Sequence, residues 1–375
     1  MKPAERFIKE KLDERKSAGN FRALKQQTNL VDFCSNDYLG FARSAVLKEK
    51  IDQETKRSGI ISNGSTGSRL LTGNSDFAEE LERHLASLYQ CEAGLIFNSG
   101  YDANIGLFSA LPRRGDTIIT DELIHASIID GARLSYANRY IFTHNDPGSL
   151  EEKLKHAKGN CYVAIESVYS MDGDSPAIAD ILDLTEKHGA NLIVDEAHAV
   201  GLYGSGLVDE AIEDRIFARV VTFGKALGCH GAVVLGSGLL KDYLVNFARP
   251  FIYTTAPSFH QLASIKMAFE LLAESSGKVE SLKDNITLFR QNIKLADEYP
   301  LTDSSSAIQC ILLKSNEKAK SLAAKLQTAG LDVRPILSPT VPAGTERIRI
   351  CLHAFNTPGE IFLLTNTINN FINAS

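Results

Sequence analysis

The sequence lacks the features that mark membrane and nucleic-acid-binding proteins. No apolar run approaches the roughly 20 residues that a membrane-spanning helix needs. No block of Lys and Arg is present, and the formal net charge is −6, which argues against nucleic acid as a partner. The N-terminal MKPAERFIKEKLDERK is charged throughout and lacks the apolar core of a signal peptide. We therefore expect a cytoplasmic protein with no membrane partner.

Cysteine is sparse and shows no paired spacing. The six cysteines are Cys34, Cys91, Cys161, Cys229, Cys310 and Cys351. None of them forms a C-x-x-C pair, which argues against both a disulfide framework and a zinc site. We expect no metal centre.

The length and composition indicate a globular chain with more than one core. A chain of 375 residues is too long for one ordinary core, and 44% hydrophobic with 23% charged residues is typical of a globular protein. We expect an N-terminal helix and extended segment over 1–43, a large domain over 44–268 and a small domain over 269–375.

Short apolar runs alternate with helix-length segments through the middle of the chain. The runs are 93–97, 117–120, 139–142, 161–165, 191–195 and 219–223. They are apolar throughout, as in strands buried on both faces, so the pattern predicts an α/β domain with a mostly parallel central sheet. The tail differs: it predicts a smaller α+β domain, with strands at 307–313 and 347–352 and helices at 315–329 and 357–372.

Two charged side chains follow buried strands in the predicted sheet. Asp195 ends the run 191–195, and Lys225 follows the run 219–223 among small residues. Open α/β sheets bind ligands at this edge. A protonated pyridine nitrogen would compensate the buried carboxylate, and a desolvated lysine amine beside a cationic cofactor is a nucleophile. The structural alternatives are an Asp that caps a helix and a solvated surface Lys.

A third element suits a phosphate. The segment Asn98–Asn104 follows a strand and opens a helix, where free backbone N–H groups bind anions. A plain strand-to-helix turn is the alternative. No G-x-G-x-x-G is present, so a dinucleotide fold is not supported. A P-loop is excluded because Ala226 stands where Ser or Thr is required.

Together these elements resemble fold-type I pyridoxal-phosphate (PLP) enzymes, and within them the α-oxoamine synthases. The motifs are SNDYLG (35–40), GSTGSRLLTGN (64–74), HAS (125–127), HND (144–146), ESVYSMDGD (166–174), VDEAHAVGLYG (194–204), TFGKALG (222–228) and PTVPAGTERIR (339–349). The resemblance runs from about residue 30 to 353. It implies a PLP-dependent acyltransferase with a fold-type I large domain.

Within that family the chain looks most like the branch that joins L-alanine to a pimeloyl thioester in biotin biosynthesis. Phe223 stands where glycine-using relatives typically have Leu, and Ala-Val-Val at 232–234 stands where they have Gly-Tyr. The acyl carrier, CoA or an acyl-carrier protein, is left open. The alternatives are a relative that uses glycine or serine, giving aminoketobutyrate, aminolevulinate or a sphingoid base precursor, and a non-catalytic PLP-fold binding or regulatory module.

The resemblance implies roles around the cofactor ring. Lys225 would hold PLP as a Schiff base and then act as general base, and Asp195 would pair with the ring nitrogen. His125 would stack on the ring, and His198 would contact the ring 3-oxygen. Two further residues would line the surroundings of the ring, namely Glu166 and Ser170.

Further roles concern the phosphate and the substrates. Gly100 and Tyr101 would bind the phosphate through backbone N–H groups, and Thr222 through its hydroxyl. Thr254 or Thr255 would reach the phosphate of the partner subunit, which implies a homodimer. The resemblance also assigns the substrate contacts: Arg349 to the amino-acid carboxylate, Asn36 and Thr340 beside the substrate, and Arg22 near the acyl group.

Overall fold

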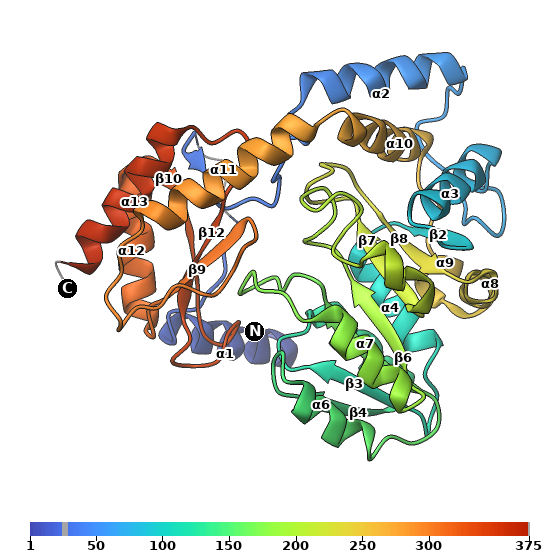
Figure 1. Cartoon of the computed structure of the whole chain (residues 1–375), viewed down its shortest axis with the longest axis horizontal. Helices are drawn as coiled ribbons and strands as arrows, with labels where there is room; N and C mark the ends of the chain where they lie inside the picture. The colour runs from blue at the N-terminus through green and yellow to red at the C-terminus, as the bar shows by residue number, and fades with distance from the viewer. Residues whose placement is uncertain (25–28, 374–375) are drawn as a thin grey trace.

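A seven-stranded sheet forms the centre of the larger part of the chain in this computed structural model, which describes residues 1–24 and 29–373 (Figure 1). Its strands are β2 (Ala93–Phe97), β3 (Thr117–Asp121), β4 (Asn138–Phe142), β5 (Cys161–Glu166), β6 (Asn191–Asp195), β7 (Ala218–Thr222) and β8 (Ala232–Gly236). They follow the order β2-β8-β7-β6-β5-β3-β4. The strands from β7 to β4 are parallel, and β8 is antiparallel to both β7 and β2. The predicted α/β fold with a mostly parallel sheet is confirmed.

Neighbouring residues of the central strands pack into cores on opposite faces of the sheet. Ile118 and Ile193 belong to one core, and Ile119 and Val194 belong to the other, as the two-residue period of a strand requires. The first core is covered by α4 (Gly100–Ala110), α5 (Ala126–Ser135) and α8 (Gly238–Phe247). The second is covered by α6 (Pro147–Leu154) and α7 (Ile178–Lys187). The sheet is thus the middle of three layers.

Two strands differ from the sequence-based expectation. The edge strand β4 is not buried on both faces, because it has a neighbour on one side only and its Ile141 is 47% exposed. Strand β8 is absent from the predicted set. It follows β7 after a short connection and pairs antiparallel with it, so no helix separates the two apolar runs.

Serine side chains fix the starts of two helices. Ser75 Oγ accepts a hydrogen bond from Ala78 N at the start of α3 (Asp76–Leu88), at 3.2 Å. Ser99 Oγ accepts one from Asp102 N at the start of α4, at 3.0 Å. Such caps satisfy helix N–H groups that have no partner within the helix. The cap at Ser99 holds the first turn of α4 directly after β2.

A three-stranded antiparallel sheet, in the order β11-β12-β9, forms the centre of the smaller part. Its elements are β9 (Ile308–Leu312), α12 (Asn316–Thr328), β10 (Leu331–Asp332), β11 (Arg334–Ile336), β12 (Arg347–Cys351) and α13 (Pro358–Ile372). The predicted strands and helices of the tail lie within two residues of these bounds. The short β10 pairs with β1 (Val31–Asp32), so the N-terminal segment joins this part of the molecule.

The remaining helices complete the described part of the chain. They are α1 (Pro3–Ser17), α2 (Ala45–Ser58), the 3₁₀ helix η1 (Glu210–Arg215), α9 (Arg249–Ile252), α10 (Phe259–Ala273) and α11 (Ser276–Asn292). Helix α10 lies beside α2, and α11 continues toward the small sheet (Figure 1). The predicted boundary at residue 268 falls inside α10 and stays a proposal. Within residues 1–24 and 29–373, no helix combines the length and apolarity needed to cross a membrane.

Candidate active site

A cavity of about 150 Å³ opens at the carboxyl ends of strands β5, β6 and β7. Glu166, Asp195 and Thr222 are the last residues of these strands, and all three line the cavity. Open parallel sheets bind ligands at this edge. The other lining residues are Gly100, Tyr101, Asn104, His125, Ser127, Ala197, Val220 and Lys225. The cavity therefore brings together most of the residues that the sequence assigns to the cofactor, and we call it the strand-end cavity.

The carboxylate of Asp195 is buried and held by two donors. Asn104 Nδ2 donates to Oδ2 at 2.7 Å, and the backbone N–H of Ala197 donates to Oδ1 at 2.9 Å. Asn104 Nδ2 also lies 3.0 Å from Ser127 Oγ, which ties α4 to the start of α5. A carboxylate fixed in this way presents its charge in one direction, as pairing with a ring nitrogen would require.

The amine of Lys225 lies 2.8 Å from His198 Nε2, and His198 Nδ1 lies 2.8 Å from the hydroxyl of Tyr38. Burial, followed by the positive charge of Lys225, holds the pKa of His198 well below its usual value. The imidazole is therefore neutral, and its Nε2 accepts from the amine while Nδ1–H faces Tyr38. Burial, opposed by the charge of Asp195, lowers the pKa of Lys225 to about 8. The lowered pKa makes the unprotonated amine, which a nucleophile or base requires, far more accessible near neutral pH than in an ordinary lysine.

Glu166 contributes a carboxyl group to the same cavity. Burial and then the charge of Asp195 raise the pKa of Glu166 to about 8, so the group is largely protonated at neutral pH. Its Oε2 accepts from Ser170 N at 3.2 Å, and its buried Oε1 has no hydrogen-bond partner among the residues that the structure describes. Asn104 Oδ1 is likewise buried without a partner. Such unpaired atoms around a cavity indicate that a polar group belongs there.

The first turn of α4 and Thr222 border the space on one side. A Cβ added to Gly100 would lie 3.2 Å from Thr222 Oγ1, so the two residues flank the same gap. Unpaired N–H groups at a helix start bind anions. A helix start that suits a phosphate, an amine with a lowered pKa and a fixed carboxylate together match the chemical groups of PLP. We therefore assign this cavity to PLP.

His125 is held at the start of α5. Its Nδ1 lies 2.7 Å from Ser127 Oγ, and its ring meets that of Tyr101 edge-on at 6.5 Å between centroids. Burial lowers the pKa of His125, which favours the neutral ring. The ring is thus oriented within the cavity, and its stacking on the cofactor stays a prediction.

Arg349 reaches toward this region from β12 of the small sheet. Its Nε donates to the carbonyl of Ser170 at 2.7 Å, and its Nη2 donates to Asn36 Oδ1 at 3.1 Å. Tyr38 donates to the same Asn36 oxygen at 3.2 Å. The network therefore runs from Lys225 through His198 and Tyr38 to the guanidinium of Arg349.

Eight predicted residues do not line the strand-end cavity, and hydrogen bonds described above join four of them to it or to one another, namely Ser170, His198, Asn36 and Arg349. The other four have partners elsewhere. Arg22 Nη2 donates to Thr340 Oγ1 at 3.1 Å, and both line a separate cavity of about 320 Å³. Thr254 Oγ1 and the carbonyl of Thr255 both accept from Asn98 Nδ2, at 3.0 and 2.9 Å. This places the latter pair beside the start of α4, and their role toward a partner subunit stays a prediction.

Sequence reasoning assigned no role to Asn104 and Tyr38. Asn104 lies four residues after Gly100, on the same face of α4, so the helical period could have identified it. Tyr38 lies within the SNDYLG motif, but its partner His198 is 160 residues away in the chain. Only the fold brings those two side chains together.

The chain is similar to enzymes of one class along most of its length. Residues 28–367 match the aminotransferase class I and II family. An 8-amino-7-oxononanoate synthase of Emericella nidulans is 42% identical over 369 residues, which cover 91% of this chain and 89% of the relative. The similarity therefore includes both sheets and the strand-end cavity.

Solved structures show the same fold. The 8-amino-7-oxononanoate synthase of Francisella tularensis has a TM-score of 0.76 at 28% identity, covering 92% of this chain and 98% of that one. A serine palmitoyltransferase variant of S. paucimobilis, solved with a bound PLP–myriocin adduct, has a TM-score of 0.89 at 26% identity, covering 100% and 99%. Both neighbours match this chain over nearly their whole length.

Proposed function

This chain belongs to the aminotransferase class I and II family and to its α-oxoamine synthases, and from this we propose that it condenses L-alanine with a pimeloyl thioester to give 8-amino-7-oxononanoate. The reaction is a PLP-dependent acyl transfer of biotin biosynthesis that releases the thiol carrier and carbon dioxide. The relatives' names support the substrate pair.

One observation supports the chemistry above the others. The amine of Lys225 and the fixed carboxylate of Asp195 line a single cavity that also contains a helix start. This pairing is what a PLP enzyme needs, because one group must bind the cofactor covalently and the other must keep its ring nitrogen protonated. PLP, when bound, supplies an electron sink for the negative charge that develops at Cα of the amino acid.

The residues of the chain then divide the work of proton transfer and orientation. Lys225 would hold the cofactor, and its amine, which the lowered pKa makes a better base near neutral pH, would take the proton from Cα of the amino acid. Asp195 keeps the opposite end of the site negatively charged. Arg349 binds the carboxylate of alanine through a planar fork, which sets the direction of the Cα–H bond.

A serine-using α-oxoamine synthase is the second candidate. The serine palmitoyltransferase of S. paucimobilis shares the fold with a TM-score of 0.89, so the fold itself does not choose between alanine and serine. The difference between the two side chains is one hydroxyl, which a pocket distinguishes only if it provides a partner for that hydroxyl. The names of the relatives with higher identity favour alanine.

A homodimer is part of the proposal. Ala256 N donates to the carbonyl of Gly67 at 2.9 Å, so the segment 64–74 packs on the segment that contains Thr254 and Thr255. Leu70 and Leu71 in that segment are both exposed, and neighbouring exposed apolar side chains are typical of an interface. A second copy of the chain would bury them and bring Thr254 or Thr255 to the neighbouring phosphate.

The substrate test uses the PLP-loaded protein with pimeloyl-CoA or pimeloyl-acyl-carrier protein and each of alanine, glycine and serine. We expect thiol release and the product mass of 8-amino-7-oxononanoate with alanine, at least about tenfold above glycine, since one methyl group discriminates by this order. The Lys225→Ala variant is the control. A preference for serine or glycine contradicts the proposed amino-acid substrate, and no thiol release with any pair contradicts the proposed enzyme activity.

The dimer is tested separately by sedimentation. A fully active monomer contradicts the proposed homodimer.

A further inference from the structure

The loop of residues 170–173, which we call the bridge segment, is bound by the small part of the molecule at every carbonyl. The donors come from β12 and from the loop before β9. They are Arg349 Nε to Ser170 O (2.7 Å), Arg347 Nη1 to Met171 O (3.0 Å), Thr302 Oγ1 to Asp172 O (2.9 Å) and Ser304 Oγ to Gly173 O (2.8 Å). The bridge segment comes after β5 of the large sheet in the chain, but its carbonyl groups are bound by the small part of the molecule.

The bridge segment has no room to shift toward β9. Gly173 has a φ of +79°, and a Cβ added there would lie 2.3 Å from the carbonyl oxygen of Ile308. This contact distance is shorter than any ordinary packing contact, so only glycine allows the backbone to come this close. The position of the loop is thus defined by close packing as well as by hydrogen bonds.

The two ends of the bridge segment are attached to the large part. At one end, Ser170 N donates to Glu166 Oε2, and Glu166 lines the strand-end cavity. At the other end, Asp174 Oδ2 lies 2.7 Å from His144 Nε2. Although burial lowers it, the hydrogen bonds to Asp121 and Asp174 raise the pKa of His144 to about 10, so this contact is an ion pair at neutral pH. The bridge segment thus connects the small sheet to the cavity.

Arg347 and Arg349 lie two residues apart on β12, and their side chains therefore point to the same face of the strand. Arg349 binds the first carbonyl of the bridge segment, and Arg347 binds the second and forms an ion pair with the carboxylate of Asp172. Arg347 is only 5% exposed, so these contacts are shielded from water. A buried arginine with two partners on one loop holds that loop in one place.

We propose that Arg347 is a positioning residue for the amino-acid substrate: it fixes the bridge segment against β12, and the Ser170 carbonyl of that segment fixes Nε of Arg349. The proposal rests on the function proposed above, in which Arg349 binds the substrate carboxylate. The bond at Nε acts together with those from Nη1 to Cys351 Sγ and from Nη2 to Asn36 Oδ1 to set the plane of the Arg349 guanidinium. Without Arg347, the bridge segment and the Arg349 guanidinium are held less firmly. Even a small displacement of a group that orients the substrate lowers the reaction rate.

The test compares alanine with ethylamine, which is alanine without its carboxylate. Each is titrated into the PLP-loaded protein, and the change of the cofactor absorbance gives the Kd. For Arg347→Gln we expect the Kd of alanine to rise about tenfold, as for the loss of a charge-assisted contact, while the Kd of ethylamine stays unchanged. Hydrogen exchange of the peptide over 168–175 should become faster in the same variant. Equal weakening of both ligands, or no weakening of alanine, overturns the proposal.

Two further variants grade the effect. Arg347→Lys keeps the charge but offers no fork, so we expect an intermediate Kd for alanine. Asp172→Asn removes the ion pair and leaves the bond from Arg347 to Met171 O, so it should weaken alanine less than Arg347→Gln does. If Arg347→Gln does not fold, Asp172→Asn still tests whether the contact between Arg347 and the bridge segment affects alanine binding. Wild-type affinity for alanine in both variants counts against the positioning role.

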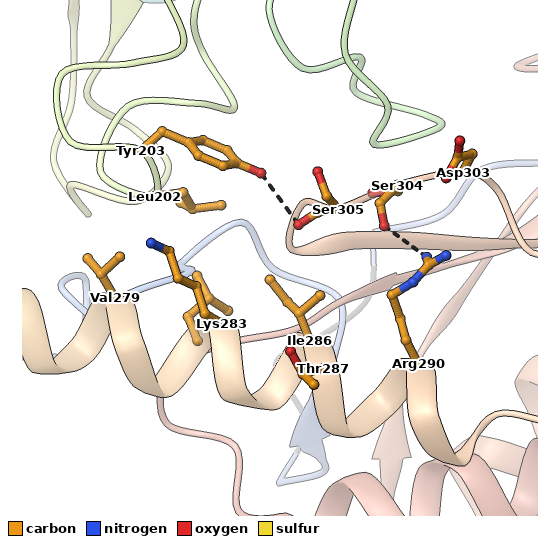
Figure 2. Close-up of a pocket in the computed structure, with 11 residues that line it drawn as sticks. Leu202, Tyr203, Val279, Lys283, Ile286, Thr287, Arg290, Asp303, Ser304 and Ser305 are labelled. Carbon is orange, nitrogen blue, oxygen red and sulfur yellow. Dashed lines mark hydrogen bonds between the residues drawn. The ribbon is translucent and has the colours of Figure 1, made fainter.

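The matched control is another contact between the same two parts. Figure 2 shows Tyr203, whose hydroxyl donates to the carbonyl of Ser305 at 3.5 Å. This contact lies at a cavity of about 410 Å³ between the loop at 202–203 and α11, which we call the junction cavity. Tyr203→Phe should leave the Kd of alanine unchanged, and a rise as large as that of Arg347→Gln overturns the proposal. If the wild type binds serine rather than alanine, the substrate proposal fails, while the same comparison made with serine still decides the role of Arg347.

Discussion

The strand-end cavity and the junction cavity differ in size and in how their polar groups are held. The strand-end cavity measures about 150 Å³, and the junction cavity about 410 Å³. In the smaller one, the carboxylate of Asp195 has two donors and the amine of Lys225 has one partner. The protein's own contacts therefore orient the reactive groups.

The junction cavity has an apolar wall and a polar one, in which Arg290 Nη1 donates to the carbonyl of Ser304 at 2.8 Å (Figure 2). Val279 and Ile286 of α11 form one wall, and Leu202 lies opposite them (Figure 2). Lys283 extends across this wall, and within residues 1–24 and 29–373 it makes no hydrogen bond or ion pair. A site for proton transfer needs groups of fixed direction and shifted pKa, and these occur in the smaller cavity. The larger of the two cavities is therefore not the one that contains the reactive groups.

Replacement of Lys225 tests whether the reaction takes place in the strand-end cavity, and it has the largest expected effect on turnover. Lys225→Ala should lower turnover on the order of 10³-fold or more, because it removes both the covalent attachment of the cofactor and the base. Thiol release from the pimeloyl thioester measures the loss. In the wild type, borohydride reduction should attach the cofactor to the peptide that contains Lys225. A label on another lysine would show that the cavity has been assigned wrongly.

Asp195→Asn tests whether charge or shape matters in the strand-end cavity. The substitution keeps the shape and one acceptor oxygen for Asn104, but its NH2 group then faces the N–H of Ala197, and the negative charge that favours a protonated ring nitrogen is lost. We expect the rate of proton exchange at Cα of alanine in D₂O to fall on the order of 100-fold, as for loss of a preorganised charge. Saturating PLP serves as the control for weak cofactor binding. Near-normal exchange would mean that Asp195 only holds the ring in place.

The sequence identified the parts of this molecule that rest on local pattern. The strands at 93–97, 161–165 and 191–195 were recognisable because each is a short apolar run between helices, and Asp195 followed from its place at a strand end. β8 was not recognisable by this rule, because no helix separates it from β7. β1 and β10 contain two residues each and are too short for any periodicity.

Site residues that act through distant partners were harder to predict. Asn104 has no distinctive chemistry of its own, and its position beside Asp195 depends on how α4 packs against the edge of β6. The contact between Tyr38 and His198 depends on the N-terminal segment crossing to the large sheet. Pairing across such distances is set by the tertiary fold rather than by propensity.

Arg349→Lys has a smaller expected effect, because it acts on substrate affinity rather than on the chemical step. Lysine keeps the positive charge but cannot bind the Ser170 carbonyl, Asn36 and a carboxylate together through one planar group. We expect the KM for alanine to rise about tenfold with a smaller change in kcat. The KM for the pimeloyl thioester is the internal control. An equal rise for both substrates would indicate a general disturbance of the small sheet.

Lys283→Ala tests whether the junction cavity takes part in the reaction, and it has the smallest expected effect on turnover. Lys283 is exposed on α11 beside the junction cavity, and among the residues that the structure describes it has no partner to lose. Its truncation leaves the buried Leu282 and Ile286 in place, so we expect turnover within about twofold of the wild type and little change in stability. Thiol release and the melting temperature measure the two effects. Lys225 and Lys283 both lie at the edge of a cavity, but only Lys225 faces a fixed imidazole and a buried carboxylate. A loss of turnover in Lys283→Ala comparable to that in Lys225→Ala would show that the junction cavity takes part in the reaction, and that fixed polar groups are not what distinguishes the two cavities.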